Sequence, residues 1–93
     1  MQPRDAAFPK VGAGFHADIK TSERAFRLFA HVTPEGWKAE VYNMDAHRWF
    51  ASEWADDADD AKRKAQKLAR RLVPGEYPVV WKLNPKPKEA GEP

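Results

Sequence analysis

Three aromatic side chains, Phe29, Tyr42 and Trp49, fall on alternating positions of predicted strands, among basic residues. Aromatic rings on an open sheet can stack on unpaired bases while Lys and Arg contact phosphates. The same rings can form a contact surface for a protein or for a second copy of the chain, or stabilise the sheet as cross-strand pairs. The candidate binding residues on this face and on a basic helix are Arg27, Phe29, His31, Lys38, Tyr42, Trp49, Arg63, Lys67 and Arg70.

Catalytic and metal-binding chemistry has weaker support. The chain has no cysteine, and His16, His31 and His47 are too far apart for a local metal motif. The aspartates at residues 56–60 lack the spacing of a calcium loop and are better explained as helix capping. Neither serine lies in the context of an activated nucleophile. We therefore predict no catalytic residue, no metal and no cofactor, and expect a protein that is not an enzyme.

Composition bounds the class of protein. Ninety-three residues with four Trp, five Phe and two Tyr suffice for a single small domain with an aromatic core. No apolar run approaches the roughly 20 residues of a membrane span. Without cysteines or a signal-peptide pattern, we expect a cytoplasmic, bacterial protein with no membrane partner. The formal net charge is +2, and the excess of Lys and Arg falls within residues 56–73.

The domain is expected to cover residues 15–83. Residues 1–14 contain prolines and glycines without apolar periodicity and are predicted to be a disordered lead-in, with Gly12 and Gly14 supplying flexibility. Residues 84–93 are rich in Pro and Lys and are predicted to be a disordered tail. Between them, residues 15–20 are a weaker strand candidate than residues 25–32, 37–42 and 48–54.

Two hairpin registers define one inner face of the sheet. A turn at Pro34-Glu35 pairs Val32 with Trp37 and Leu28 with Val41. A four-residue loop at 44–47 places Tyr42 opposite Trp49, and further along pairs Val41 with Phe50, Ala39 with Ser52, Trp37 with Trp54 and Lys38 with Glu53. The predicted inner face consists of Phe26, Leu28, Ala30, Val32, Trp37, Ala39, Val41, Phe50 and Trp54. Both hairpins assign the same residues to this face, as a single register requires.

Residues 56–73 predict an amphipathic helix. Its narrow apolar stripe is formed by Ala58, Ala61, Ala65, Leu68, Ala69 and Leu72. Asp56 or Asp57 can cap its start, Pro74-Gly75 can end it, and Asp59–Arg63 and Asp60–Lys64 can form ion pairs. Small residues let such a helix lie close to a sheet with bulky side chains.

The order of elements predicts an α+β fold. We expect a three- to four-stranded antiparallel sheet with one helix on one face, and leave open an extra strand at either end. Residues 77–83 alternate like a strand, but Pro78 restricts them to an edge strand or an extended segment. If this segment lay over Tyr42 and Trp49, it would remove the candidate surface.

The motif W-x-A-x-V-Y at residues 37–42, with the aromatic strand and helix that follow, resembles two groups of domains. One group is the small bacterial domains of three strands and a helix, and the other is the arm-type DNA-binding domain of phage-type integrases. The shared residues are core positions: Trp37, Ala39, Val41, Tyr42 and the helix alanines. The second resemblance implies that the outer sheet face enters a DNA major groove, led by Arg27, Lys38 and Arg48. Glu40 and Glu53 oppose that role.

The leading functional hypothesis is a non-enzymatic binding module. It would contact a protein partner or a second copy of itself through the outer sheet face around Phe29, Tyr42 and Trp49. The alternative is nucleic-acid binding by the same face, assisted by the basic helix.

Overall fold

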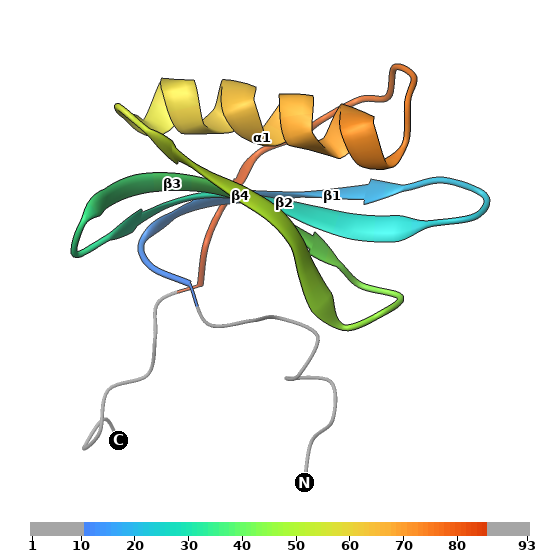
Figure 1. Cartoon of the computed structure of the whole chain (residues 1–93), viewed down its shortest axis with the longest axis horizontal. Helices are drawn as coiled ribbons and strands as arrows, with labels where there is room; N and C mark the ends of the chain where they lie inside the picture. Colours follow the sequence, from blue (N-terminus) through green and yellow to red (C-terminus); the bar gives the residue numbers. More distant parts are fainter. Residues whose placement is uncertain (1–10, 86–93) are drawn as a thin grey trace, which may run out of the picture.

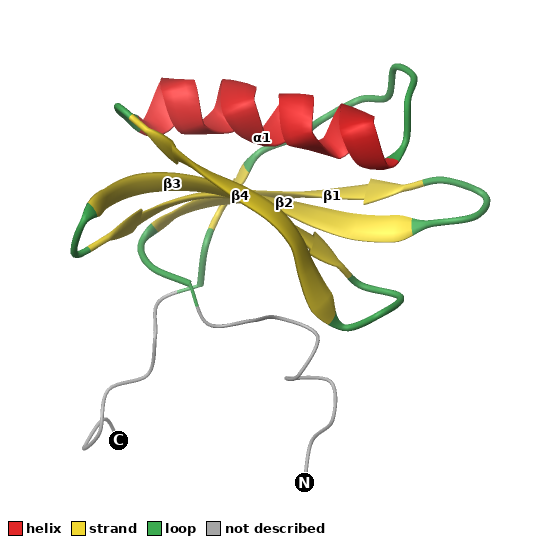
Figure 2. Cartoon of the chain, viewed as in Figure 1, coloured by secondary structure: helices red, strands yellow, loops and turns green. Residues whose placement is uncertain are grey.

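The computed structural model describes residues 11–85, which form a five-stranded sheet and a helix. The elements are β1 (Gly14–Lys20), β2 (Ala25–Thr33), β3 (Gly36–Asn43), β4 (Arg48–Ala55), α1 (Ala58–Leu72) and β5 (Lys82–Leu83). The antiparallel strands lie in the order β4-β3-β2-β1-β5, and α1 lies across one face of the sheet (Figures 1 and 2). We call this the helix face and the opposite side the outer face. The predicted α+β fold is confirmed, with a larger sheet than the three or four strands expected.

The weak strand candidate at residues 15–20 is the fourth long strand of this sheet. β1 pairs with β2 over its whole length, so that Ala17 lies opposite Leu28 and Ile19 opposite Phe26. Both β1 side chains are buried in the core. A strand whose alternate residues are apolar is stabilised mainly by this burial, which the short sequence pattern by itself understates.

The segments just before β1 and just after β5 are hydrogen-bonded to the domain. Of the ends predicted to be disordered, 1–14 and 84–93, residues 1–10 and 86–93 lie outside the described part of the chain. Within the rest, the Val32 N–H donates to the Ala13 carbonyl over 2.9 Å, and the Asn84 side chain donates to the Gly12 carbonyl over 2.9 Å. A Cβ atom at Gly12 would lie 2.0 Å from the Val32 carbonyl oxygen. Glycine at this position therefore permits a close approach of two backbones, whereas the sequence suggested flexibility.

The hairpin of β2 and β3 has the predicted register. Val32 pairs with Trp37, Ala30 with Ala39 and Leu28 with Val41. Its turn is closed by Thr33, whose hydroxyl donates to the Gly36 carbonyl and accepts from the Glu35 N–H. This side-chain bonding fixes the turn and hence the register of the two central strands.

The predicted register of β3 and β4 is correct at Tyr42–Trp49 and wrong beyond it. Phe50 is an extra residue that shifts the pairing by one position, so Val41 lies opposite Ala51 and Trp37 opposite Ala55. Such a bulge moves every later side chain to the other face. Ala51 and Ala55 pack against the core in place of the predicted Phe50 and Trp54, which are exposed.

Two further residues assigned from the sequence are placed differently. Val32 was predicted on the buried inner face, but it lies at the end of β2 and is exposed. Lys38 lies opposite Trp54, and the predicted partner Glu53 lies opposite Ala39. Because Ala39 is buried among the residues of the helix face, Glu53 belongs to the helix side of the sheet. The shift at Phe50 accounts for the change at Glu53.

Helix α1 begins and ends close to the predicted positions. The Asp57 carboxylate caps its start by accepting from the Asp60 N–H over 2.8 Å. The Asp60 carboxylate accepts from the Asp56 N–H over 3.0 Å and pairs with Arg63 and Lys64. The predicted Asp60–Lys64 pair is thus present, and Arg63 pairs with Asp60 in place of the predicted Asp59. The Asp56 N–H and the two cations hold the pKa of Asp60 below its usual value of 3.8, against the opposing effect of burial.

The helix contacts β2, β3 and β4 through its alanine stripe. Ala61, Ala65 and Ala69 are fully buried, and Leu68 lies between them in the same core cluster. Across from them are the bulky side chains of the sheet, among them Phe26, Leu28 and Val41. Alanine allows the helix backbone to approach the sheet closely, and the sheet side chains supply the apolar volume. Complementary sizes therefore define this interface.

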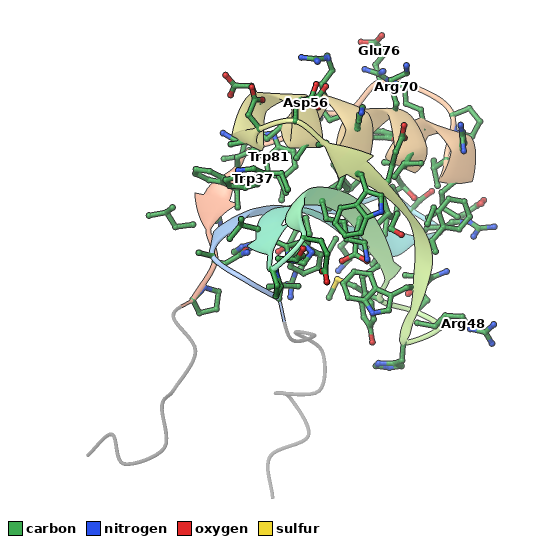
Figure 3. All side chains as sticks on the ribbon, turned by 60° about the vertical axis from the view of Figure 1, so that its left-hand side comes forward. Trp37, Arg48, Asp56, Arg70, Glu76 and Trp81 are labelled. Carbon is green, nitrogen blue, oxygen red and sulfur yellow. The ribbon has the colours of Figure 1, made fainter. Side chains whose placement is uncertain are left out.

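The segment after α1 lies on the helix side of the sheet. The Tyr77 ring contacts Phe26 edge-on at a centroid distance of 6.2 Å, and its hydroxyl donates to the Val73 carbonyl over 2.7 Å. Burial raises the pKa of Tyr77, and the nearby Arg70 charge partly opposes this. Trp81 and Trp37 both pack against the core, and Figure 3 labels both below the helix layer. The two-residue strand β5 then pairs with β1.

The position of this segment answers the question that the sequence left open. Residues 77–81 fill the helix side, and Lys62 extends its ammonium group over the rings of Phe15 and Trp81. Tyr42 on β3 and Trp49 on β4 lie two and three strands away from β1, on the outer face. The segment therefore leaves the surface around those residues uncovered.

Within residues 11–85, α1 is too short and too polar to cross a membrane.

Replacing Ala65 with Leu is expected to lower the free energy of unfolding by about 1–3 kcal/mol, because the added carbons have no space between α1 and the sheet. Urea denaturation followed by circular dichroism measures the change. Lys67→Leu, on the exposed side of the same helix, is the control and is expected to change stability by less than about 0.5 kcal/mol. Equal effects of the two substitutions would contradict the close helix–sheet contact.

Replacing Asp60 with Asn is expected to lower the free energy of unfolding at neutral pH. The lowered pKa of Asp60 means that its carboxylate stabilises the fold above its usual pKa of 3.8. This contribution is lost as the pH falls through the lower pKa of the folded state. The difference between wild type and Asp60→Asn should therefore narrow on acidification, as urea titrations at several pH values can show. Asp59→Asn is the control, and a pH-independent difference for Asp60→Asn would contradict the assignment.

Candidate functional site

The outer face of β1 to β4 carries a cluster of aromatic rings centred on Phe29. The Phe29 ring lies 5.6 Å from that of Trp49, and Tyr42 lies 5.1 Å from Trp49. The rings of His16 and His31 also contact Phe29, at centroid distances of 6.3 and 6.2 Å. The two contacts of Trp49 are edge-to-face, the arrangement that ring quadrupoles favour. The structure thus brings together the three aromatic residues that the sequence singled out.

Most of this cluster is buried. Phe29 is 0% exposed, Tyr42 7% and His31 5%. These three side chains are packed among their neighbours on the outer face and offer little exposed area to a partner. Trp49, at 39% exposed, is the predicted aromatic residue that presents a surface.

A buried hydrogen-bond chain runs beside the rings. The Gly12 N–H donates to Nδ1 of His31 over 3.1 Å, which assigns the ring proton to Nε2. Nε2 then donates to Oε1 of Glu40 over 2.7 Å. Lys38 approaches the other oxygen of Glu40 at 3.5 Å. Each polar group in this network has a hydrogen-bond partner. The network therefore holds β2, β3 and the residues before β1 in position.

The cations of the outer face are engaged with carboxylates. Arg27 forms a two-point ion pair with Asp18, which lies opposite it on β1. Lys38 is paired with Glu40 and also lies 5.0 Å from the centroid of the Trp54 ring. These pairs neutralise much of the positive charge that phosphate groups would need.

Strand β4 presents a second aromatic group that sequence reasoning assigned to the core. Phe50 is 41% exposed and Trp54 50%, and together with Trp49 they form what we call the β4 aromatic strip. Trp54 shares the outer face with Trp49, because the strand gains one residue between them at the bulge. The sequence signal is the pair of alanines at 51 and 55, which pack against the core from this edge strand.

The helix residues of the predicted site lie on the other side of the sheet. Arg63 pairs with Asp60, while Lys67 and Arg70 are exposed on α1. Figure 3 shows Arg70 in the helix layer and Arg48 well away from it, at the start of β4. A single flat ligand on the outer face cannot also contact the exposed side of α1, because the sheet lies between them.

No group of three His, Asp or Glu side chains among residues 11–85 is arranged to hold a metal ion. His16 lies next to Asn84, with Nδ1 3.0 Å from its Oδ1 atom. His31 is bonded to Gly12 and Glu40, and His47 occupies the loop before β4 with a left-handed backbone, φ 56°. Each histidine of the chain therefore has a different local setting.

Comparison of the chain with models of known protein families, with curated proteins and with solved structures finds no match.

Replacing Glu40 with Ala is expected to lower the free energy of unfolding by about 1–3 kcal/mol, because the buried Nε2–H of His31 loses its acceptor. Urea denaturation measures the change. Asp18→Ala is the matched control on the same face: its carboxylate pairs with Arg27 but is 51% exposed, against 11% for Glu40. An exposed pair contributes less than about 1 kcal/mol. A larger cost for Asp18→Ala than for Glu40→Ala would contradict this account.

Proposed function

We propose that the chain is a non-enzymatic protein-binding module that acts through the β4 aromatic strip. The observation that carries the proposal is the exposure of three large rings, Trp49, Phe50 and Trp54, on one eight-residue strand. Tryptophan and phenylalanine supply large apolar area at a small cost in side-chain entropy and are enriched in protein interfaces.

The surroundings of the strip favour a protein ligand. Trp49 lies against the buried rings of Phe29 and Tyr42, so its orientation is fixed before binding. A fixed anchor loses little conformational freedom when a partner contacts it. Lys38 beside Trp54 and Arg48 at the start of β4 supply a polar margin, which is the usual setting of an apolar contact patch.

Nucleic-acid binding by this face is the weaker alternative. The cations near the rings are paired with Asp18 and Glu40, and the basic side chains of α1 lie on the opposite layer. Stacking on Trp49 or Trp54 would then lack the phosphate contacts that dominate affinity for nucleic acids. Among the described residues, the outer face also lacks a paired nucleophile and base, which favours binding over catalysis.

A photo-crosslinking amino acid, p-benzoylphenylalanine, at position 50 tests the proposal in the cells that make the protein. We expect irradiation to yield a protein adduct, resistant to nuclease, that is lost when Trp49 and Trp54 are both replaced by Ala. The same amino acid at position 67 on α1 is the control and is expected to yield no such adduct. Adducts that disappear with nuclease, or equal adducts from both positions, would overturn the proposal.

An NMR titration with a mixed single-stranded oligonucleotide at low salt tests the alternative. Under the proposed function, the signals of residues 27–31, 38–42 and 48–54 stay unchanged. Shifts confined to these strands that fade as salt is raised would favour nucleic acid, since phosphate contacts release counterions.

A further inference from the structure

Within residues 11–85, strand β4 has a neighbouring strand on one side only. It is the last strand in the order β4-β3-β2-β1-β5, whereas β5 pairs with part of the other edge. One carbonyl near the end of β4 already has a partner: the Lys64 ammonium donates to the Trp54 carbonyl over 2.9 Å. An eight-residue edge strand with exposed rings is a template for pairing with another strand unless something blocks it.

The charges on β4 select one way of pairing. Its sequence, RWFASEWA, contains one cation, Arg48, and one anion, Glu53. Parallel pairing in register would place like charges opposite one another, which is destabilising. Antiparallel pairing of two copies about a twofold axis can instead place Arg48 opposite Glu53 of the second copy. Symmetry then repeats this contact with the roles exchanged.

The same register also matches side-chain sizes. It places Trp49 opposite Ser52 of the second copy, while Phe50 is the extra residue of the bulge. The Trp49 ring thus lies opposite a small side chain, so the two copies of Trp49 do not compete for the same space. Figure 3 shows the Arg48 side chain directed away from the rest of the domain, where a second copy can approach it.

The two faces of the sheet agree with this register. Arg48 and Glu53 lie opposite Asn43 and Ala39 on β3, and these two β3 residues share the helix face. Trp49 and Ser52 lie opposite Tyr42 and Glu40, which share the outer face. Both proposed pairs, Arg48–Glu53 and Trp49–Ser52, therefore consist of residues on one face, as strand pairing requires.

We infer that the partner of the β4 aromatic strip is a second copy of the chain, paired antiparallel along β4 with Arg48 opposite Glu53. This inference rests on the proposed function, because it assigns the partner of the same surface. The two sheets become continuous across the twofold axis, and the exposed backbone groups of both edges are satisfied.

Charge reversal tests the register. Sedimentation equilibrium over a range of concentrations should show a dimer for the wild type. Arg48→Glu and Glu53→Arg should each weaken the dimer by at least about tenfold, because each places like charges opposite one another. The double variant, Arg48→Glu with Glu53→Arg, should restore it. Lys67→Glu on the exposed side of α1 is the matched control and should leave the dissociation constant unchanged.

The outcomes separate this inference from the proposed function. A monomer at every concentration overturns self-association, while adducts from position 50 to a different protein would leave the binding function standing. A dimer that is lost with Trp49→Ala but unaffected by either charge reversal overturns the β4 register. Failure of the double variant to restore the dimer also overturns it, provided that its circular dichroism spectrum matches that of the wild type.

Discussion

The contact between the alanine stripe of α1 and the helix face of the sheet is the constraint on which the other features depend. Ala61, Ala65 and Ala69 bring the helix close to Phe26, Leu28 and Val41, so a single helix closes the core. Residues 77–81 complete the same layer beside β1. Because α1 and residues 77–81 all lie on the helix face, the side chains of the outer face are held in place by the sheet's own residues.

The outer face meets this requirement with rings and short polar networks. Phe29 is surrounded by His16, His31 and Trp49, and His31 joins Gly12 to Glu40 through hydrogen bonds. Arg27 and Lys38 are used in ion pairs on the same face. The residues that looked most suited to binding are thus largely structural. The apolar surface available to a partner lies on the neighbouring edge strand, where Trp49, Phe50 and Trp54 are exposed.

One extra residue in β4 decides which rings are exposed. Without the bulge at Phe50, regular alternation would direct Trp54 toward the helix and Glu53 toward the outer face. With it, Ala51 and Ala55 fit under the helix and Trp54 joins Trp49 on the outer face. The bulge therefore links the fit of the helix to the composition of the proposed binding surface.

The sequence by itself determined the α+β class, the extent of α1 and the register of β2 with β3. These depend on local signals: the spacing of Ala61, Ala65 and Leu68, the cap at Asp57, and the turn from Thr33 to Gly36. Only the tertiary structure decided the position of residues 77–83, the burial of Phe29 and Tyr42, and the exposure of Phe50 and Trp54. A bulge costs little locally, and its position is set by how well β4 fits between β3 and α1, which alternation along a single strand does not encode. The role of Gly12 likewise became visible only when β2 lay beside it, because a close approach of two backbones is a property of the pair.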